Sequence, residues 1–232
     1  MPALIHLYAT DLDCFPHGLQ LLPAADEQRV LQKGTETLRR RQRASLAFVR
    51  HVLAEHLSKP PEDIAIRRDP GGKPYTSGIH FNLSHSGARA LLAVSTIPLG
   101  IDIEKRIEER RFGVSRRVLS PTELGEWLLL PDAAAQASAL TRAWVRKEAV
   151  LKALGSGLRV APSRVDVGWA GQGGGGVIRA KQRTAGIYGA VAESDTHQFT
   201  VQDLPGDEGF MASIAYDEQH AGATLVAVQR RP

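Results

Sequence analysis

The sequence is poor in cysteine and holds no long apolar run. Cys14 is the only cysteine among 232 residues, so a disulfide within the chain is excluded and a reducing compartment is favoured. No stretch of about 18 apolar residues occurs, which argues against a membrane span. The first residues lack a basic head followed by an apolar segment, which argues against a secretory signal. We therefore expect a cytoplasmic protein that does not act in a membrane.

Aromatic residues are also scarce, and neither sign of charge dominates. Phe, Trp and Tyr form 6% of the chain, and 29 basic residues compare with 25 acidic ones. The densest basic run (Arg39, Arg40, Arg41 and Arg43) most resembles the solvated face of a helix. A non-catalytic nucleic-acid-binding module is one alternative, but few aromatic residues lie near this run to stack on bases. The mild basic excess suits an acidic partner, such as a phosphate or an acidic protein, and we expect no nucleic-acid partner.

Helical and strand-like patterns both occur in each half of the chain. Residues 24–57 predict two helices separated near Gly34, and residues 120–154 predict a second helical region. Ser120, followed by a proline and by Glu123, is typical of a capping box. Strands are expected at residues 4–12, 62–69, 79–86, 90–95, 97–106, 163–169, 177–182, 186–193, 197–204, 210–216 and 223–229, and a flexible hairpin loop at the glycine-rich residues 171–176. Hairpin-length turns between many strands favour an antiparallel α+β fold over a parallel doubly wound sheet.

The predicted helix that ends at Gly155 carries charges where its apolar face should continue. That face is formed by Leu140, Trp144, Leu151 and Leu154. Lys147 and Glu148 lie in the turn between Trp144 and Leu151, and Glu148 shares a face with Lys152. Because buried charges without partners are costly, we expect a partner such as a metal ion or a ligand phosphate. An ordinary exposed ion pair between Glu148 and Lys152 is the alternative.

Two carboxylates share one face of the strand predicted in LGIDIEKR. Asp102 and Glu104 alternate with isoleucines, so both project to the same side. Adjacent carboxylates repel each other unless they share a cation or a proton, and oxygen ligands suit Mg²⁺ or Mn²⁺. The alternative is a solvated edge strand whose charge Lys105 and Arg106 neutralise.

Residues 79–86 predict a half-buried strand with His80, Asn82 and Ser84 on its solvent face. Ser84 and His85 near its end could donate hydrogen bonds to a phosphate. No aspartate-led triad or histidine ligand spacing accompanies them, which excludes a serine hydrolase. Lys73 follows a glycine pair in PGGKP, where the backbone can approach a ligand closely.

Taken in order, four motifs carry a resemblance to a known family. They are GGKP, FNLSHSG, LGIDIE and WVRKEAVLKALGSGL, and the resemblance runs from about Arg41 to Leu158. The chain resembles the 4′-phosphopantetheinyl transferases of the surfactin-synthetase-activating (Sfp) type. These enzymes use Mg²⁺ to transfer the phosphopantetheine arm of coenzyme A to a serine of a carrier protein, releasing adenosine 3′,5′-bisphosphate. Val145 departs from the Ser, Thr or Cys usual there, at a position that is not an expected ligand.

The resemblance implies a role for each matching residue. Asp102, Glu104 and Glu148 would bind the metal, and Lys147 and Lys152 would contact coenzyme A phosphates and the active site. Arg41, Arg68, Lys73, Ser84 and His85 would line the coenzyme A site. Glu123 matches an acidic position of debated role, and we expect Glu148, or a water it orients, to act as the base for the carrier serine.

The resemblance also implies an architecture of two similar halves. Each would hold an antiparallel sheet and a long helix, with the halves related by a pseudo-twofold axis and divided as residues 1–105 and 106–232. The active site would lie between them, in a monomer that meets acidic acyl or peptidyl carrier proteins. Another Mg²⁺-dependent phosphotransferase, using the same carboxylates without coenzyme A, is the second alternative.

Overall fold

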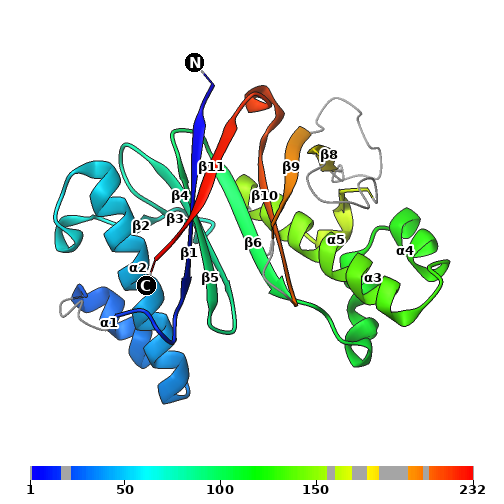
Figure 1. The fold of residues 1–232 in the computed structure, drawn as a ribbon, viewed down its shortest axis with the longest axis horizontal. Helices are drawn as coiled ribbons and strands as arrows, with labels where there is room; N and C mark the ends of the chain where they lie inside the picture. The colour runs from blue at the N-terminus through cyan, green and yellow to red at the C-terminus, as the bar shows by residue number, and fades with distance from the viewer. Residues whose placement is uncertain are drawn as a thin grey trace.

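The computed structural model describes residues 2–16, 22–155, 160–168, 177–182, 198–205 and 209–231. The predicted loop at 171–176 and the predicted strand at 186–193 lie outside the described residues. Within that part of the chain, two sheets lie side by side, and one long helix packs on each (Figure 1). The α+β architecture expected from the sequence is confirmed.

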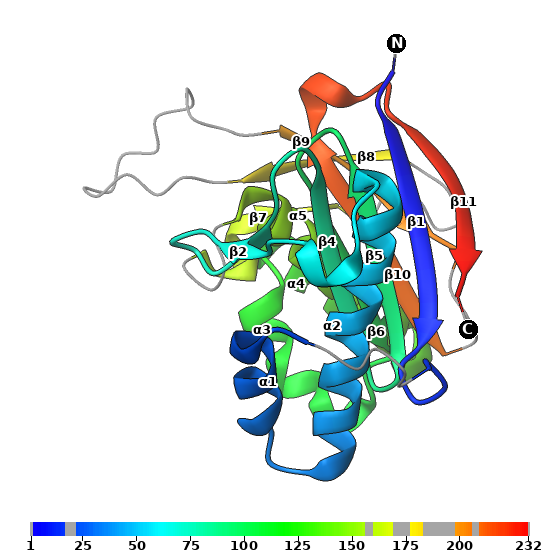
Figure 2. The same cartoon turned by 90° about the vertical axis from the view of Figure 1, so that its left-hand side faces the viewer.

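The first sheet has the strand order β11-β1-β5-β4. Its strands are β1 (Leu4–Asp11), β4 (His80–Ser86), β5 (Arg89–Ser95) and β11 (Thr224–Arg230). All pairs are antiparallel except β1 with β11, which run side by side in parallel (Figure 2). Helices α1 (Ala24–Leu31) and α2 (Glu36–Leu57) cover one face, where Phe48 and Leu53 pack with Phe81 and Leu92.

The second sheet is antiparallel throughout and has the order β6-β10-β9-β8-β7. Its strands are β6 (Leu99–Lys105), β7 (Val165–Asp166), β8 (Val177–Gln182), β9 (Gln198–Leu204) and β10 (Phe210–Asp217). Helix α5 (Ala133–Leu154) packs on this sheet, beside the short helices α3 (Ser115–Val118) and α4 (Pro121–Leu128). A third apolar cluster joins the two sheets, since Ile5, Leu7 and Ala93 pack with Ile101 and Ile214.

Each sheet includes one strand from the other half of the chain. Strand β6 pairs with β10 in the second sheet, whereas β11 pairs with β1 in the first. A division at residue 105, as expected from the sequence, would place β6 in the first half and β11 in the second. The sheets have the opposite arrangement for these two strands. None of the helices in the described ranges combines the length and the apolar character that a bilayer crossing requires.

Local sequence signals account for the helix ends. Thr35 caps α2 after the break at Gly34, and Ser120 and Glu123 form the predicted capping box at α4. Helix α5 begins after Asp132, whose side chain accepts from the Ala135 N–H, and ends at Gly155 with φ of 67°. A left-handed residue is readily formed by glycine, which explains why the helix stops there.

The segment after α2 differs from the expectation. A strand was expected over residues 62–69, but only β2 (Arg67–Arg68) forms, paired with β3 (Pro74–Tyr75). Pro60 and Pro61 instead favour a 3₁₀ turn at Pro61–Asp63, because proline fixes φ and cannot donate to a strand ladder.

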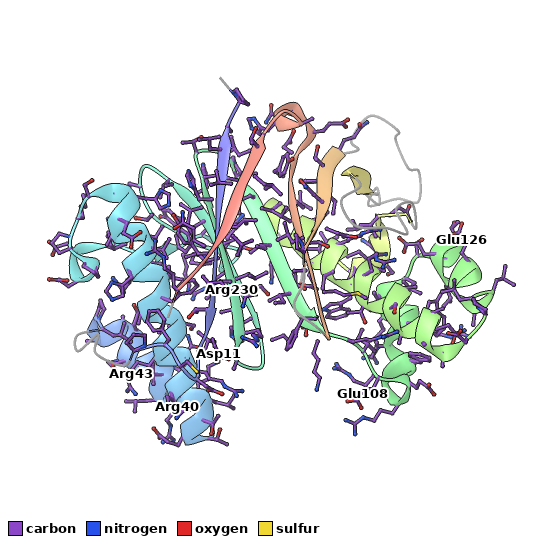
Figure 3. The ribbon with its side chains drawn as sticks, in the orientation of Figure 1. Asp11, Arg40, Arg43, Glu108, Glu126 and Arg230 are labelled. Carbon is purple, nitrogen blue, oxygen red and sulfur yellow. The ribbon has the colours of Figure 1, made fainter. Side chains whose placement is uncertain are left out.

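The arginine run lies on α2 and is partly paired. Arg40 and Arg41 both contact Asp13, and Arg43 contacts Glu27 at 2.9 Å. Figure 3 shows Arg40 and Arg43 at the lower end of this half, Glu108 at the lower end of the other half and Glu126 at its outer side. These contacts agree with the solvated helix face expected from the sequence.

Candidate active site

The two carboxylates of β6 face the neighbouring strand β4 and helix α5. Asp102 is 4% exposed, and its Oδ1 accepts from Lys152 Nζ at 2.6 Å and from Ser84 Oγ at 2.7 Å. Glu104 is half-buried, and its Oε2 accepts from Ser86 Oγ at 2.8 Å. The second oxygen of Asp102, Oδ2, is buried and has no hydrogen-bond partner among the described residues. A buried carboxylate oxygen in that state is suited to a cation.

Helix α5 reaches the same point because β6 lacks a side chain where the two elements cross. A Cβ placed on Gly100 would lie 2.1 Å from the Ala149 oxygen and 2.4 Å from the Ala153 nitrogen. The close approach brings Lys152 over the strand, where its Nζ also donates to the Ile101 oxygen at 3.2 Å. Glu148 lies one helical turn earlier on the same face.

Three acidic groups influence one another here. The pKa of Asp102 is raised by burial, although Lys152 and Ser84 oppose the shift. Burial, and then the charge of Asp102, also raises the pKa of Glu148. Burial raises the pKa of Glu104, with Ser86 opposing the shift and Asp102 adding to it. A divalent cation would relieve this cost, since it neutralises carboxylates that repel each other.

The three carboxylates do not form a closed cage. Among the described residues, no three acidic, histidine or cysteine side chains converge closely enough to hold a metal ion. The donor chemistry and the unpartnered Asp102 oxygen fit Mg²⁺, and the expected ligand set of Asp102, Glu104 and Glu148 stays a prediction.

Lys147 and Glu123 have a different setting from the one expected. Lys147 is fully buried, and its Nζ donates to Glu123 Oε2 at 2.5 Å and to the Pro162 oxygen at 3.2 Å. Glu123 also accepts from the Ser120 and Val167 N–H groups. Burial lowers the pKa of Lys147, and the charge of Glu123 opposes that shift. These contacts join α4, α5 and the segments on both sides of β7, not the carboxylates of β6, because Lys147 points to another side of α5.

A cavity of about 250 Å³ lies beside Lys152. Its lining comes from three separate motifs: Gly71, Gly72, Lys73 and Pro74 of the turn, Asn82 and Leu83 of β4, and Leu151, Lys152 and Gly155 at the end of α5. Lys73 is held within this wall, because its Nζ donates to the Leu99 oxygen at 2.9 Å and to the Ala153 oxygen at 3.3 Å. Burial lowers the pKa of Lys73 to about 8.

The other residues expected to bind coenzyme A, His85, Arg41 and Arg68, differ in their interactions. The pKa of His85 is lowered first by desolvation of its ring and then by the positive charges of Lys152, Lys33 and Arg41, and the charge of Asp102 opposes the shift. Arg41 forms a two-bond ion pair with Asp13, at 2.9 and 2.6 Å. Arg68 is exposed and donates to the Gly72 oxygen in the turn.

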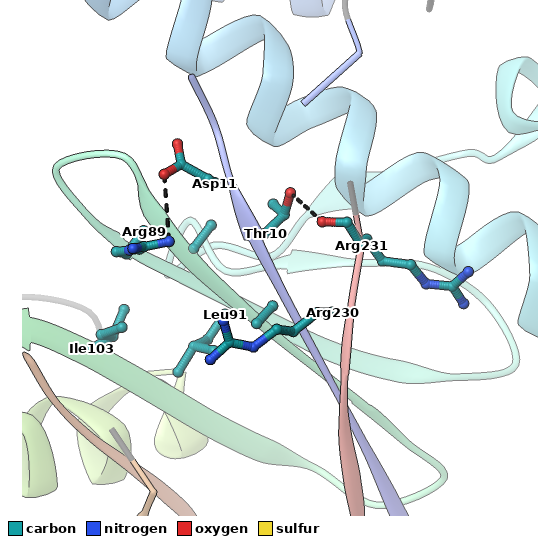
Figure 4. A pocket seen from close by; sticks show the side chains of 9 residues that line it. Thr10, Asp11, Arg89, Leu91, Ile103, Arg230 and Arg231 are labelled. Atoms are coloured by element: carbon teal, nitrogen blue, oxygen red, sulfur yellow. Dashed lines mark hydrogen bonds and ion pairs between the residues drawn. The ribbon is translucent and has the colours of Figure 1, made fainter. Parts of the chain in front are cut away.

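Another cavity, of about 160 Å³, lies on the opposite face of β6 (Figure 4). Ile103, which sits between Asp102 and Glu104 in sequence, lines it together with Leu91, Arg89 and Arg230. Because successive strand residues point to opposite faces, this cavity is separated from the carboxylates by the strand itself.

The prediction for the polar face of β4 is wrong. Asn82 and Ser84 were expected to face solvent, but both are buried because β6 covers that face. Asn82 and Ser86 were missed as site residues. The signal was available in the sequence, because three hydrogen-bonding side chains recur at every second position of FNLSHS.

Comparison with known proteins relates the whole arrangement to one family. A model of the 4′-phosphopantetheinyl transferase superfamily matches residues 98–206, and a model of the 4′-phosphopantetheinyl transferase N-terminal region matches residues 11–97. A 4′-phosphopantetheinyl transferase from a Nostoc species, HetI, is 33% identical over 166 residues, covering 66% of this chain and 70% of the relative. The chain belongs to the 4′-phosphopantetheinyl transferase family.

Two bacterial members of the 4′-phosphopantetheinyl transferase family align over a shorter stretch. The gsp protein of Aneurinibacillus migulanus is 35% identical over 114 residues, covering 49% of this chain and 47% of the relative. Sfp of Bacillus subtilis is 34% identical over 114 residues, covering 48% of this chain and 50% of the relative. The chain therefore spans about half the length of these two relatives. The two family models meet between residues 97 and 98, which agrees with the pairing of β6 in the second sheet.

Proposed function

We propose that the protein transfers the phosphopantetheine group of coenzyme A to a serine of an apo acyl or peptidyl carrier protein. The observation that carries the proposal is the meeting of three motifs at the cavity beside Lys152, next to the buried carboxylates of β6. Family membership supports the same reaction, since the relatives are named for this transfer. The opposite cavity offers no such cluster of carboxylates and lysines beside it.

The cation site would be formed by Asp102, Glu104 and Glu148. When bound there, Mg²⁺ would neutralise charge on the pyrophosphate oxygens of coenzyme A and stabilise the transition state. Lys152 lies 2.6 Å from Asp102, so its ammonium group is in place to contact the same phosphates. Lys33, Arg41 and His85 would bind the remaining phosphate charge, since the positive charges of Lys33 and Arg41 lower the pKa of His85.

The wall of the cavity would position the rest of coenzyme A. Lys73 joins the turn to the end of α5 through two backbone carbonyl groups, so we propose that it shapes the wall and does not bind phosphate through its Nζ. For Lys147 and Glu123 we propose a positioning role, because their buried pair fixes one side of α5 while Glu148 and Lys152 face the site.

The chemical step is a displacement at the phosphorus next to the pantetheine arm. The serine oxygen forms a bond to that phosphorus, the bond to the adenosine side breaks, and adenosine 3′,5′-bisphosphate leaves. We propose that Glu148, or a water it orients, takes the serine proton, because the Glu148 carboxylate lies one helical turn from Lys152 on the same face of α5 and can accept a proton. A positive surface would draw in the acidic carrier protein, and we expect the enzyme to act as a monomer in the cytoplasm.

The direct test combines the protein with coenzyme A, Mg²⁺ and a panel of apo carrier proteins. We expect one carrier or more to gain the mass of a single phosphopantetheine group, and the Asp102→Ala variant to produce no gain. Hydrolysis of another phosphate ester without any carrier modification would favour a different phosphotransferase. Salt-sensitive binding to nucleic acid that Asp102→Ala leaves unchanged would favour the basic binding module instead.

A further inference from the structure

Strands β4 and β6 lie next to each other although they belong to different sheets. Three side chains of β4 bridge them by accepting backbone N–H groups of β6. Asn82 Oδ1 accepts from Ile101 at 2.8 Å, Ser84 Oγ from Ile103 at 3.4 Å, and Ser86 Oγ from Lys105 at 3.1 Å. We call Asn82, Ser84 and Ser86 the polar ladder. The polar ladder provides acceptors for every second N–H group along the edge of β6. This is possible because every second side chain of β4 points toward that edge.

The two serines of the polar ladder also hold the carboxylates. A hydroxyl group has one proton to donate. Ser84 Oγ accepts from the Ile103 N–H and from Lys152 Nζ at 3.0 Å, so its own proton is directed to Asp102 Oδ1. Ser86 Oγ accepts from the Lys105 N–H and therefore donates to Glu104 Oε2. Each serine thus fixes one oxygen of one carboxylate.

The other oxygen of each carboxylate is left for a ligand. In the part of the chain that the structure describes, Asp102 Oδ2 is buried and has no hydrogen-bond partner, while Oδ1 accepts from Ser84 and Lys152. Ser86 holds Glu104 by Oε2 in the same way, two residues further along the strand. The serines therefore aim the free oxygens in a fixed direction, as groups behind metal ligands commonly do.

We propose that Ser84 and Ser86 are positioning residues that orient Asp102 and Glu104 toward a divalent cation, and that Asn82 sets the register between β4 and β6. This inference rests on the cation-binding role assigned to these carboxylates in the proposed function. It goes beyond that function because it gives the serines a task directed at the carboxylates and not at coenzyme A.

The test measures binding of Mn²⁺ alone, without coenzyme A or carrier protein, by electron paramagnetic resonance of the free ion. We expect Ser84→Ala and Ser86→Ala to weaken the Mn²⁺ affinity by about tenfold or more, as loss of a supporting hydrogen bond does at other metal sites. Ser86→Thr keeps a hydroxyl group and should bind Mn²⁺ nearly as well as the wild type. If Ser86 had a purely structural role, Ser86→Thr and Ser86→Ala would not differ in Mn²⁺ affinity in this way.

Ser95→Ala is the matched control. Ser95 is a buried serine on β5 that donates to the Leu4 oxygen at 2.7 Å and accepts from the Ile97 N–H, and neither bond involves a carboxylate. Its loss should leave the Mn²⁺ affinity unchanged, and thermal unfolding of every variant checks that the fold is intact. If Ser84→Ala does not fold, Ser86→Ala carries the test, because Ser86 is only half-buried.

The outcomes separate this proposal from the proposed function. Unchanged Mn²⁺ affinity in folded Ser84→Ala and Ser86→Ala would overturn the positioning role, even if the wild type modifies carrier proteins. Weakened affinity in both variants would support it, even if no carrier in the panel is modified. A wild-type protein that binds no Mn²⁺ would overturn the positioning role outright.

Discussion

The two long helices of the molecule share their length and a buried arginine–aspartate pair, but they present different side chains to their sheets. Helices α2 and α5 each have 22 residues, and each buries one arginine in a two-bond pair with an aspartate. Arg50 binds Asp26 at 3.2 and 2.7 Å, and Arg146 binds Asp203 at 2.9 and 2.7 Å. Each arginine also donates to a backbone carbonyl group, of Ile64 and Gly168 respectively. The pseudo-twofold relation between the halves stays a prediction, but these pairs are what two similar halves would share.

The difference lies in the other residues that the helices present to their sheets. Helix α2 presents apolar side chains such as Phe48, Val52 and Leu53. Helix α5 presents Glu148 and Lys152 to β6, and it approaches the strand closely at Gly100. Among the described residues, the two helices share the buried arginine pair, whereas the proposed reacting groups lie on α5 and its strand. The predictions below test this contrast, from the largest expected effect to the smallest.

Gly100→Ala should cause the greatest loss. The new methyl group would overlap the α5 backbone at Ala149 and Ala153, which cannot move away as a flexible side chain could. We expect the free energy of unfolding to fall by about 3 kcal/mol or more, with transfer activity lost because Lys152 is displaced. Urea unfolding and the carrier assay measure both. Gly113→Ala, where no described atom lies within 4 Å of the new Cβ, is the control and should not lose stability.

Arg50→Met and Arg146→Met test the buried arginine pair that the two helices share. Each leaves a carboxylate without its main partner, so each should lower the free energy of unfolding by about 3 kcal/mol. We expect the larger loss for Arg50, because the side chain of Asp26 is 6% exposed and that of Asp203 is 20% exposed. Asp26 keeps its bond from Arg29, and Asp203 keeps the Ser213 hydroxyl. Urea unfolding of both variants gives the comparison. A loss at only one of the two arginines would contradict a shared role for the two pairs.

Glu148→Gln tests the chemical difference through pH. The pKa of Glu148 is raised in the folded protein, so its protonated form favours the native state. The stability that this group contributes is full below the ordinary pKa of 4.5 and is lost as pH rises through the folded value. In metal-free buffer we therefore expect the unfolding temperature to fall across this window, and Glu148→Gln to weaken the dependence while abolishing transfer.

The matching measurement adds Mg²⁺ to the same pH series. A cation that binds only the folded protein should raise the unfolding temperature most above the window, where the carboxylates are ionised. An identical pH dependence in wild type and Glu148→Gln would show that ionisation of Glu148 does not cause the loss of stability.

Gly125→Ala should have the smallest effect, and in the opposite direction. Gly125 lies inside α4, and nothing lies within 4 Å of the Cβ that alanine would add. Alanine lowers the entropy of the unfolded chain and favours helix, so we expect a gain of about 0.5–1 kcal/mol in the free energy of unfolding. Thermal unfolding measures the gain, and transfer activity should not change. A loss of stability would indicate that α4 is held by contacts which the alanine disturbs.

The sequence alone predicted the features that local chemistry decides. The break before α2, the capping box at Ser120 and the end of α5 at Gly155 all follow from residues within one helical turn. The neighbourhood of Asp102, Glu104 and Glu148 was also expected, since two of these residues share a strand face and the third interrupts an apolar helix face.

Features that depend on distant segments could not be read in this way. The burial of Asn82 arises because β6 covers β4, and the pairing of Lys147 with Glu123 arises because α4 folds against α5. The exchange of β6 and β11 between sheets likewise depends on which strand edges meet. Periodicity shows that a residue is buried, but it does not show which segment covers it.

The parallel pairing of β11 with β1 sets a condition on how the protein is made. Strand β1 leaves the ribosome early, yet its outer neighbour consists of Thr224–Arg230 and arrives only when almost all of the other strands exist. Until then, one edge of β1 exposes backbone groups that can pair with another chain. In the first sheet, the strand that is synthesised first is therefore among the last to have both of its neighbours. A chain arrested before Thr224 would carry an open, aggregation-prone edge despite having every residue of the proposed site.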